Sequence, residues 1–382
     1  MRICLVSQEY PNETDFGGIA TYNYYLSKGL IKYNINVIVI CRSYIKNSYH
    51  IDKNGIEIYR IYCNDDTEYR KKISQLILKL NKYKTIDLIE SPEWKADLYD
   101  FISNNKYETN IPIVIKLHTP YFVWKKYNDI NQTNNDIEKI ERETICLSDG
   151  LSSCSNSLKS IIVNEYNIKP SKITVIPNMI DVDKNSDNNI VRTKNSIYYI
   201  GSLEQRKGVF LLAESFKLIK KLIPSASLYF IGRDTKRNSK NISTKYCIET
   251  ILDGLSDYYF IEHVPNQEIT NYMKTAHVIV YPSLYENFPY VILEAMLNGC
   301  AIIGSDNGGV PEMIKNNISG LLYSPPSVES LTEKLLKVLL NNNTTNNLRH
   351  NALKEVEKFS IDNIIPLQIK YYNEIIQKIK KY

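Results

Sequence analysis

The chain has 382 residues, which is too long for one ordinary hydrophobic core and fits two domains of typical size. Hydrophobic residues make up 43% of it and charged residues 23%, a balance that is typical of a folded globular protein and excludes whole-chain disorder. The formal net charge of +5 permits affinity for phosphates or for an anionic membrane surface, but it gives no reason to expect nucleic acid as a partner.

Cysteine usage and apolar segment lengths bear on the compartment. The seven cysteines are scattered and form no C-x-x-C pair, which argues for a reducing compartment and against a zinc site or a disulfide framework. No segment approaches the roughly 18–20 apolar residues of a membrane span. Ile3–Val6 has the pattern of a strand, and Glu9 stands where a signal peptide would need apolar residues. We therefore expect a cytoplasmic protein, at most peripheral to the inner face of a membrane.

Short apolar runs alternate with amphipathic segments through the first half of the chain. The runs of strand length are Arg2–Ser7, Asn36–Cys41, Ile56–Ile61, Ile86–Ile89, Ile113–Leu117, Leu151–Cys154 and Ile173–Ile176. Helical patterns lie between most of them, at Ile19–Tyr33, Tyr69–Tyr83, Lys95–Ser103 and Ser157–Tyr166. This alternation predicts a parallel sheet covered by helices on both faces.

The polar run Asp183–Asn195 lacks apolar periodicity and reads as a linker, after which the alternation starts again. The expected strands are Ser196–Ile200, Ser227–Ile231, Tyr259–Ile261, Val278–Tyr281 and Ala301–Ile303, and the expected helices are Val209–Leu222, Ile242–Leu252, Val291–Asn298, Val328–Asn341 and Thr345–Phe359. The sequence therefore predicts an α/β fold of two doubly wound domains facing a deep cleft, with residues 1–182 in the first and 183–360 in the second. In such sheets, ligands bind at the carboxyl ends of the strands.

The last stretch of the chain, Ile361–Tyr382, is amphipathic and is interrupted by Pro366. A proline inside a helical pattern removes a hydrogen bond and favours a kink. We expect this stretch to bend at the proline and to cross back onto the first domain.

A pair of glycines, Gly17 and Gly18, follows the first strand and precedes the first expected helix. Adjacent glycines let a backbone approach a phosphate closely, and a helix start supplies N–H donors. A tight turn before a helix gives the same pattern, so on these residues alone both interpretations stay open. The pattern is not the G-x-G-x-x-G of a dinucleotide fold.

The turn Gly201–Gly208 holds the corresponding position in the second domain and contains Arg206 and Lys207. Both cations lie at the carboxyl end of a strand, facing the expected cleft. Since a helix N-terminus disfavours cations, two of them at this position indicate an anionic ligand such as a diphosphate leaving group. A solvated basic pair is the alternative interpretation.

Two carboxylates flank the start of the helix expected at Val291–Asn298. Glu286 precedes the helix, and Glu294 lies about one turn inside it. Glu294 could reach ribose hydroxyls, and Glu286 could meet the hydroxyls of a sugar on the other side of a diphosphate. Two surface carboxylates beside a core helix would look the same.

Pro289 stands close to the expected helix start, and proline is acceptable at a first helical position because its missing N–H would have no helical partner there. The next amides, at Tyr290 and Val291, would then point at any anion near the helix end.

These motifs together resemble the nucleotide-sugar site of retaining GT-B glycosyltransferases, specifically the family four (glycosyl transferases group 1) type. The resemblance covers nearly the whole chain and rests on Gly17-Gly18, Val175-Ile176-Pro177-Asn178-x-x-Asp181, Gly201-x-Leu203-x-x-Arg206-Lys207-Gly208, Glu286-x7-Glu294-Ala295-Met296 and Asp306-x-Gly308-Gly309-Val310-Pro311-Glu312. It implies two Rossmann-like domains and transfer of a sugar from a nucleoside-diphosphate donor.

The resemblance implies a role for each matching position. Lys207 and Arg206 would grip the donor diphosphate, and Gly18 would let the N-terminal loop approach the donor. His118 closes an apolar strand, which on sequence alone is more often structural, but it matches a family histidine beside the reacting centre. The implied catalytic residues are His118, Glu286, Lys207 and Arg206. The implied donor-binding residues are Gly17, Gly18, Ser202, Arg206, Lys207, Phe288, Tyr290, Val291 and Glu294.

Three positions depart from the family pattern. The family often has arginine after the glycine of its phosphate turn, and this chain has Ser202, so Arg206 would carry more of the phosphate charge. The family's Glu-Gly-Phe-Gly is replaced by Glu286-Asn287-Phe288-Pro289, so one amide donor is missing at Pro289.

Other chemistries fit single features less well. Paired carboxylates also occur in glycosidases, where they flank a scissile bond. Here both are attached to one strand–helix junction with an anion-binding helix end between them. Asp181-Val182-Asp183 resembles the Asp-x-Asp metal site of the other glycosyltransferase fold, but it lies at the domain exit rather than inside a nucleotide-binding half.

Two further readings concern the whole protein and its surroundings. A nucleotide-sugar epimerase of the same architecture and a non-catalytic two-lobed binding protein remain as alternatives. The helix Tyr69–Tyr83 is basic with an apolar face and could lie on an anionic membrane, which would suit a lipid-linked acceptor; a covering helix of the sheet is the alternative.

The function expected from the resemblance is retaining transfer of a sugar from a UDP- or GDP-type donor to a glycan or lipid-linked acceptor, in synthesis of a bacterial surface polysaccharide. The second domain would bind the donor and the first the acceptor, and domain closure would exclude water. We expect no metal and no cofactor besides the nucleotide sugar, and no nucleic acid.

Overall fold

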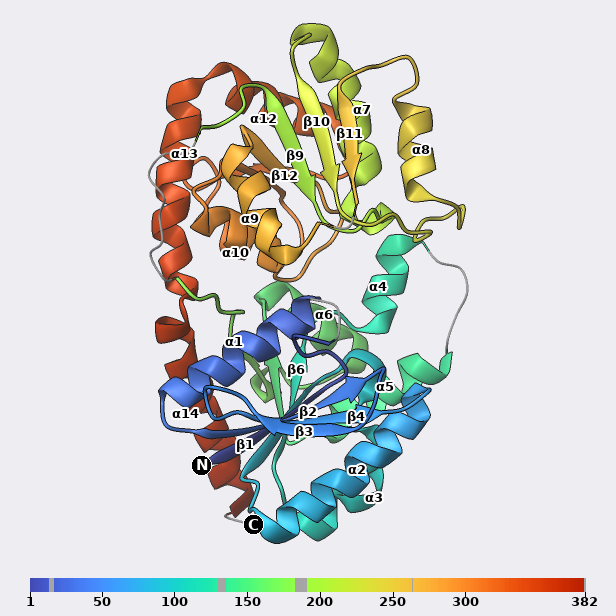
Figure 1. The fold of residues 1–382 in the computed structure, drawn as a ribbon, viewed down its shortest axis with the longest axis vertical. Helices are drawn as coiled ribbons and strands as arrows, with labels where there is room; N and C mark the ends of the chain where they lie inside the picture. Colours follow the sequence, from blue (N-terminus) through green and yellow to red (C-terminus); the bar gives the residue numbers. More distant parts are fainter. Residues whose placement is uncertain (14–16, 130–134, 183–190, 263, 381–382) are drawn as a thin grey trace. The chain divides into compact units, whose positions relative to one another are not determined.

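The computed structural model of the chain describes residues 1–13, 17–129, 135–182, 191–262 and 264–380. The chain divides into two compact units, which Figure 1 colours along the sequence. The first unit combines Met1–Phe122, Asn134–Asp181 and Phe359–Tyr382, and the second combines Val123–Thr133 and Val182–Lys358.

The first unit is built on an eight-stranded sheet with the order β3-β4-β2-β1-β5-β6-β7-β8. Its strands are β1 (Arg2–Ser7), β2 (Asn36–Ser43), β3 (Ser48–Ile51), β4 (Glu57–Tyr62), β5 (Leu88–Pro92), β6 (Ile113–Leu117), β7 (Gly150–Ser153) and β8 (Ile173–Val175). All neighbours are parallel except β3 and β4. From β1 the chain adds strands on one side, and from β5 it adds them on the other, so the order reverses between β1 and β5.

Helices cover both faces of this sheet. They are α1 (Gly18–Lys32), α2 (Asp66–Tyr83), α3 (Tyr99–Thr109), α5 (Asn135–Leu147), α6 (Asn156–Tyr166) and α14 (Ile361–Lys380), with short 3-10 turns η1 (Trp94–Ala96) and η2 (Pro170–Lys172). A further 3-10 turn, η4 (Val356–Phe359), leads from the second unit into α14. In Figure 1, α1 and α14 lie together on one side of the sheet, and α2 and α3 lie on the other.

The apolar face of α2 belongs to the core of the first unit. Tyr69, Ile73 and Ile77 are fully buried there, and Asp65 caps the helix by accepting a hydrogen bond from the amide of Glu68. The helix therefore covers the sheet, which is the alternative to a membrane-bound helix given above. That face is not available to a membrane.

Helix α14 runs through Pro366 as one continuous helix. Proline has no amide hydrogen, so the carbonyl of Asp362, one turn earlier, lacks its helical donor. The hydroxyl of Tyr33, from the end of α1, lies 3.5 Å from this carbonyl and donates to it. The packing of α14 on α1 is tight, because a Cβ added at Gly29 would lie 2.5 Å from the side chain of Ile365.

The second unit is built on a six-stranded parallel sheet with the order β11-β10-β9-β12-β13-β14. Its strands are β9 (Ser196–Ile200), β10 (Ser227–Ile231), β11 (Tyr258–Ile261), β12 (Val278–Tyr281), β13 (Ile302–Ser305) and β14 (Leu321–Tyr323). Its helices are α7 (Val209–Leu222), α8 (Thr244–Ile251), α9 (Asn266–Thr275), α10 (Tyr290–Leu297), α11 (Val310–Met313), α12 (Val328–Leu340) and α13 (Asn342–Glu355), with the 3-10 turn η3 (Gln205–Lys207). Helix α7 packs on α8 and α12, and α10 packs on α13.

The prediction of two doubly wound domains is confirmed, since both sheets are mostly parallel and reverse their strand order once. Helices α4 (Tyr121–Asn128), α5 and α9 are not anticipated from the sequence patterns. Most of α4 lies in the second unit, although the sequence places it among the residues of the first domain.

The expected linker, Asp183–Asn195, is described only from residue 191 onward. Arg192 donates hydrogen bonds to the carbonyls of Met273, at 2.9 Å, and of Asn298, at 2.9 Å. These carbonyls lie near the ends of α9 and α10, where a helix has acceptors without helical donors. Arg192 thus holds the end of α10, the helix whose start carries the site described below.

Candidate active site

The strand order of the second unit reverses between β9 and β12, and in open α/β sheets such a point is where ligands bind. The turn Gly201–Gly208 follows β9, and residues 282–289 join β12 to α10. Because the two strands are parallel neighbours, both loops leave the sheet at the same edge. The positions singled out in the sequence of the second domain therefore come together here.

Backbone contacts hold these two loops against each other. Gly208 has a φ of 69°, and a Cβ added there would lie 1.8 Å from the carbonyl oxygen of Pro282. The hydroxyl of Tyr323 donates to that same oxygen at 2.5 Å. The amide of Leu284 donates to the carbonyl of Arg206 at 2.7 Å. No side chain larger than hydrogen fits at position 208.

The loop after β13 holds the Glu286 segment from the other side. The amide of Gly309 donates to the carbonyl of Glu286 at 2.9 Å, and a Cβ added at Gly308 would lie 2.1 Å from that oxygen. The side-chain amide of Asn307 donates to the carbonyl of Leu284 at 2.7 Å. The glycines of the motif Asp306–Glu312 therefore position the backbone that carries Glu286.

Charged side chains from the two loops meet inside this frame. Arg206 is only 7% exposed, and its Nη1 lies 3.0 Å from Oε1 of Glu286. The Nζ of Lys207 lies 3.7 Å from the same carboxylate oxygen. Arg206 also donates to the carbonyl of Tyr285 at 3.0 Å. One carboxylate thus lies beside both cations of the turn.

A second carboxylate, Glu204, organises the other end of the turn. It is 2% exposed and accepts hydrogen bonds from Ser202, at 2.7 Å, and from Arg237, at 2.8 Å, while Arg206 lies 3.6 Å away. Burial alone would raise the pKa of Glu204, but the cations of Lys207, Arg206 and Arg237 and the bond from Ser202 together lower it to about 2. Glu204 is therefore ionised at neutral pH.

A small recess lies beside these charges. It is lined by Tyr199, Ile200, Lys207, Tyr281, Ser283, Glu286, Pro289, Val291 and Val310. Cation, carboxylate and helix start therefore face one space.

Helix α10 begins at Tyr290, so Pro289 is the N-cap residue and not the first helical residue that the sequence suggests. The hydroxyl of Tyr281 donates to the carbonyl of Val291 at 2.8 Å and fixes the first turn to the end of β12. Phe288 and Tyr290 are buried, at 5% and 6% exposure, so they support the loop from within.

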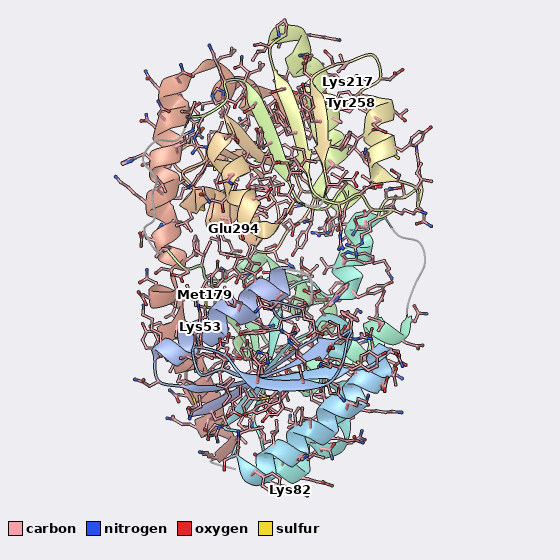
Figure 2. The ribbon with its side chains drawn as sticks, viewed as in Figure 1. Lys53, Lys82, Met179, Lys217, Tyr258 and Glu294 are labelled. Carbon is pink, nitrogen blue, oxygen red and sulfur yellow. The ribbon has the colours of Figure 1, made fainter. Side chains whose placement is uncertain are left out.

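Glu294 lies on the second turn of α10 and is labelled in Figure 2. Burial raises the pKa of its carboxyl to about 7. Within the part of the chain that the structure describes, no hydrogen bond or ion pair reaches this carboxylate. The side chain is half-buried, and a half-buried carboxylate that no described protein group binds is suited to accept hydrogen bonds from ligand hydroxyls.

The remaining predicted residues lie in the first unit. Gly17 is the N-cap of α1, and a Cβ added there would lie 2.5 Å from a carboxylate oxygen of Glu9, whereas Gly18 has no atom within 4 Å of such a Cβ. Asp15 and Phe16, which complete this loop, lie outside the described residues.

His118 follows β6 and is half-buried. Its amide donates to both carboxylate oxygens of Glu93, at 2.8 and 2.9 Å, and its ring lies edge-on to Tyr22 with centroids 5.0 Å apart. Burial and the nearby Lys116 ammonium lower the pKa of His118 to about 3, so the imidazole is neutral at neutral pH.

The Tyr22 ring beside His118 is itself held by a buried carboxylate. Its hydroxyl donates to Glu90 at 2.8 Å, and Glu90 also accepts from Gln368 and Tyr372 of α14, at 2.9 and 2.8 Å. The C-terminal helix is thereby connected to the surroundings of the histidine.

Sequence reasoning misses several residues that shape the second unit's site. Glu204 lies inside the turn Gly201–Gly208, so its position in that motif is a signal by which it could be found. Tyr127 stacks on Tyr285 with centroids 4.6 Å apart, and Asn128 accepts a hydrogen bond from the amide of Arg206 at 3.3 Å. These two come from α4, and no motif or periodicity marks them.

The described residues also bear on metals and membranes. No group of three or more His, Cys, Asp or Glu side chains placed to hold a metal ion occurs among them. Asp181 of the Asp-x-Asp pattern lies 3.5 Å from Lys28, and Asp183 lies outside the described residues. None of the helices in the described ranges is long and apolar enough to span a bilayer.

Two family profiles cover most of the chain. Residues 16–184 match Glycosyltransferase Family 4, and residues 182–355 match Glycosyl transferases group 1. The chain belongs to the group 1 glycosyltransferases. It is 26% identical to an uncharacterised glycosyltransferase of Methanocaldococcus jannaschii, over 97% of this chain and 98% of that protein.

Two further similarities extend this family assignment. The chain is 27% identical to the Escherichia coli UDP-Gal:alpha-D-GlcNAc-diphosphoundecaprenol alpha-1,3-galactosyltransferase, over 53% of this glycosyltransferase and 57% of that enzyme. The structure of Anabaena HepE in complex with UDP-glucose matches with a TM-score of 0.71 and 14% identity, over the whole of both chains. The fold of this glycosyltransferase is thus of the GT-B type, with two Rossmann-like domains.

The contact between Gly208 and Pro282 leads to a matched pair of substitutions. Gly254 also has a positive φ, of 76°, but has no atom within 4 Å of an added Cβ. Gly254→Ala should cost only the left-handed conformation, about 1–2 kcal/mol of unfolding free energy. Gly208→Ala should cost at least about 2 kcal/mol more, because its Cβ meets backbone. Urea unfolding of both variants tests this; equal costs would show that the two loops are not in contact as described.

The raised pKa of Glu294 predicts a pH-dependent stability. A carboxyl whose pKa in the folded state is about 7 contributes stability below its ordinary pKa and loses it as the pH rises through 7. The unfolding free energy of the wild type should therefore fall relative to Glu294→Gln between about pH 5 and pH 8. Glu268→Gln, at an exposed position of α9, is the control. Parallel curves for Glu294→Gln and wild type would contradict the burial of this carboxyl.

Proposed function

We propose that this glycosyltransferase moves a sugar from a UDP- or GDP-type donor to a hydroxyl of a glycan or lipid-linked acceptor, with retention of anomeric configuration, in synthesis of a bacterial surface polysaccharide. The observation that supports this best is the recess at the strand-order reversal of the second unit. Lys207, Glu286 and the start of α10 all face it. It combines the groups that a sugar diphosphate needs.

The leaving diphosphate would be held by fixed positive charge. Lys207 lines the recess, and the buried Arg206 guanidinium lies beside the same Glu286 carboxylate. The first turn of α10 adds backbone amides and the positive end of a helix dipole. Groups that are already in place when charge develops on the leaving group lower the barrier without reorganisation.

Glu286 would have two tasks. Its Oε1 faces Arg206 and Lys207, so it keeps both cations in place when no phosphate is bound. When a donor is bound, the same carboxylate is placed to accept hydrogen bonds from hydroxyls of the transferred sugar. Glu294, on the second turn of α10, would accept hydrogen bonds from the ribose hydroxyls, because no protein group within the described residues binds its carboxylate.

Acceptor activation would need little from the protein. We assign His118 to the acceptor side as a neutral hydrogen-bonding group, since its lowered pKa makes it a weak base. A phosphate oxygen of the departing diphosphate would take the acceptor proton, with attack on the face that the diphosphate leaves. Gly17, Gly18 and Ser202 complete the donor contacts in this proposal.

Relatives support the choice of substrates. The Escherichia coli enzyme is named for a UDP-galactose donor and a diphosphoundecaprenol-linked acceptor, and HepE is seen with UDP-glucose. Since two cations and a helix start neutralise the phosphates, we propose that transfer does not depend on a divalent metal.

Lys207→Ala tests the proposal. Removing a preorganised charge at a leaving group typically costs about 10²–10³ in rate. We therefore expect that loss in the release of nucleoside diphosphate from a panel of UDP- and GDP-sugars, with EDTA present. Lys217→Ala is the matched control, because Lys217 lies on α7 far from Glu294 in Figure 2.

Glu286, the carboxylate beside Arg206 and Lys207, gives a second test of the same site. Glu286→Ala should lower the same rate, because both cations lose their partner and the sugar loses an acceptor of hydrogen bonds. If Lys207→Ala and Glu286→Ala both kept near-normal turnover, this site would not hold the donor. A product of inverted anomeric configuration by NMR would overturn the retaining mechanism alone.

A further inference from the structure

The first unit carries an aromatic pair that the mechanism above leaves unused. Trp94 and Tyr121 are both half-buried, and their rings lie 6.2 Å apart at an interplanar angle of 41°. Trp94 begins η1, directly after β5, and Tyr121 begins α4, shortly after β6. Both rings therefore stand at the carboxyl edge of the sheet. The strand order of this sheet reverses between β1 and β5, which makes this the expected ligand edge.

One buried carboxylate holds the backbone of both aromatic segments. Glu141 of α5 is fully buried, and it accepts a hydrogen bond from the amide of Lys95 at 2.9 Å and another from the amide of Tyr121 at 2.8 Å. Burying a carboxylate is costly unless its oxygens are bonded. One buried carboxyl group thus fixes the backbone of the two half-buried rings relative to each other.

The backbone next to Trp94 is also in an unusual conformation. Lys95 and Ala96 have φ values of 60° and 52°, in the left-handed region that side chains other than glycine rarely adopt. Arg70 donates to the carbonyl of Lys95 at 3.3 Å and supports this turn. Such conformations persist where surrounding contacts hold them, and they cluster at binding sites.

The segments that carry Trp94 and Tyr121 are connected to His118 by the chain and by hydrogen bonds. Glu93, the residue before Trp94, accepts the amide of His118 with both oxygens. Asp97, on the same loop, accepts the amide of Gln8 at 3.1 Å and its side chain at 2.9 Å, which ties in the loop after β1. Histidine and aromatic rings therefore belong to one rigid group of loops.

We propose that Trp94 and Tyr121 form the binding surface for the acceptor and that the acceptor residue they receive is a pyranose. One face of a pyranose ring presents C–H groups, which pack on aromatic rings, while its hydroxyls point outward to polar neighbours such as His118. Two rings at an angle, held by Glu141, provide a fixed surface of this kind. This inference rests on the proposed transferase function and names the substrate class and residues on its acceptor side.

The test uses tryptophan fluorescence. The chain has two tryptophans, so Trp124→Phe leaves Trp94 as the single emitter. The probes are the methyl glycosides of glucose, galactose, mannose and N-acetylglucosamine, with mannitol as a control of similar hydroxyl content but no ring. We expect a saturable change in Trp94 emission with at least one glycoside and none with mannitol. Tyr121→Ala should weaken that binding about tenfold, or about 1.4 kcal/mol, and Tyr121→Phe should leave it nearly unchanged.

Several results would overturn the inference. The first is that no glycoside changes the Trp94 emission at concentrations up to about 100 mM, where even a weak complex would form. The second is that mannitol changes the emission as much as a glycoside does. The third is that Tyr121→Ala binds the glycoside with unchanged affinity. Release of nucleoside diphosphate from the donor panel, without acceptor, is measured in Trp124→Phe, the background of the titrations, and should stay at the wild-type level. If Lys207→Ala abolishes donor turnover but no sugar changes the Trp94 emission, only the acceptor surface is refuted. If sugars change the Trp94 emission but Lys207→Ala keeps normal donor turnover, only the donor site is refuted.

Discussion

The site of the second unit depends on one buried ion pair, Arg206 with Glu286 at 3.0 Å. A buried ion pair is costly to desolvate and becomes favourable only when its remaining hydrogen-bonding groups are occupied. Here the Tyr285 carbonyl accepts from the same guanidinium, and Glu204 lies 3.6 Å from it. The pair connects the loop after β9 with the loop after β12, so it fixes the edge at which a ligand of this sheet binds. In the proposed function, cations, carboxylate and helix start would be in place before a phosphate binds.

The first unit uses buried carboxylates for the same purpose but bonds them to backbone amides. Glu93, Asp97 and Glu141 each accept from loops at the carboxyl edge of the sheet, and burial raises their pKa values to about 7, 7 and 8. Glu90 serves the neighbouring Tyr22 and connects it to α14. In both units, then, carboxyl groups that are largely or fully buried hold the surface loops in place. This is a structural reason for charged residues inside otherwise apolar sheets.

How far the sequence predicts this structure depends on the kind of feature. Strands such as β9, β10 and β12 are predicted to the residue, because a buried parallel strand reads as a continuous apolar run. The family resemblance places Arg206 and Glu286, eighty residues apart, in one donor site, but their ion pair is not anticipated from the sequence. Nothing local marks Glu141, whose role arises from two amides brought to it by folding, and α4 has no clear helical pattern. Helix α10 begins at Tyr290, between the two starts that the sequence suggests, Pro289 and Val291, since helix boundaries depend on cap geometry.

In the proposed function, the recess at the β9–β12 reversal recognises a diphosphate by its charge. Equilibrium titration of the protein with UDP, GDP and ADP, each beside its monophosphate and its nucleoside, tests this most directly. At least one diphosphate should bind at least about tenfold more tightly than its monophosphate, a difference of about 1.4 kcal/mol, and Arg206→Ala or Lys207→Ala should remove that preference. Equal affinity for diphosphate, monophosphate and nucleoside, or a preference that survives both substitutions, would show that Arg206 and Lys207 do not recognise a diphosphate.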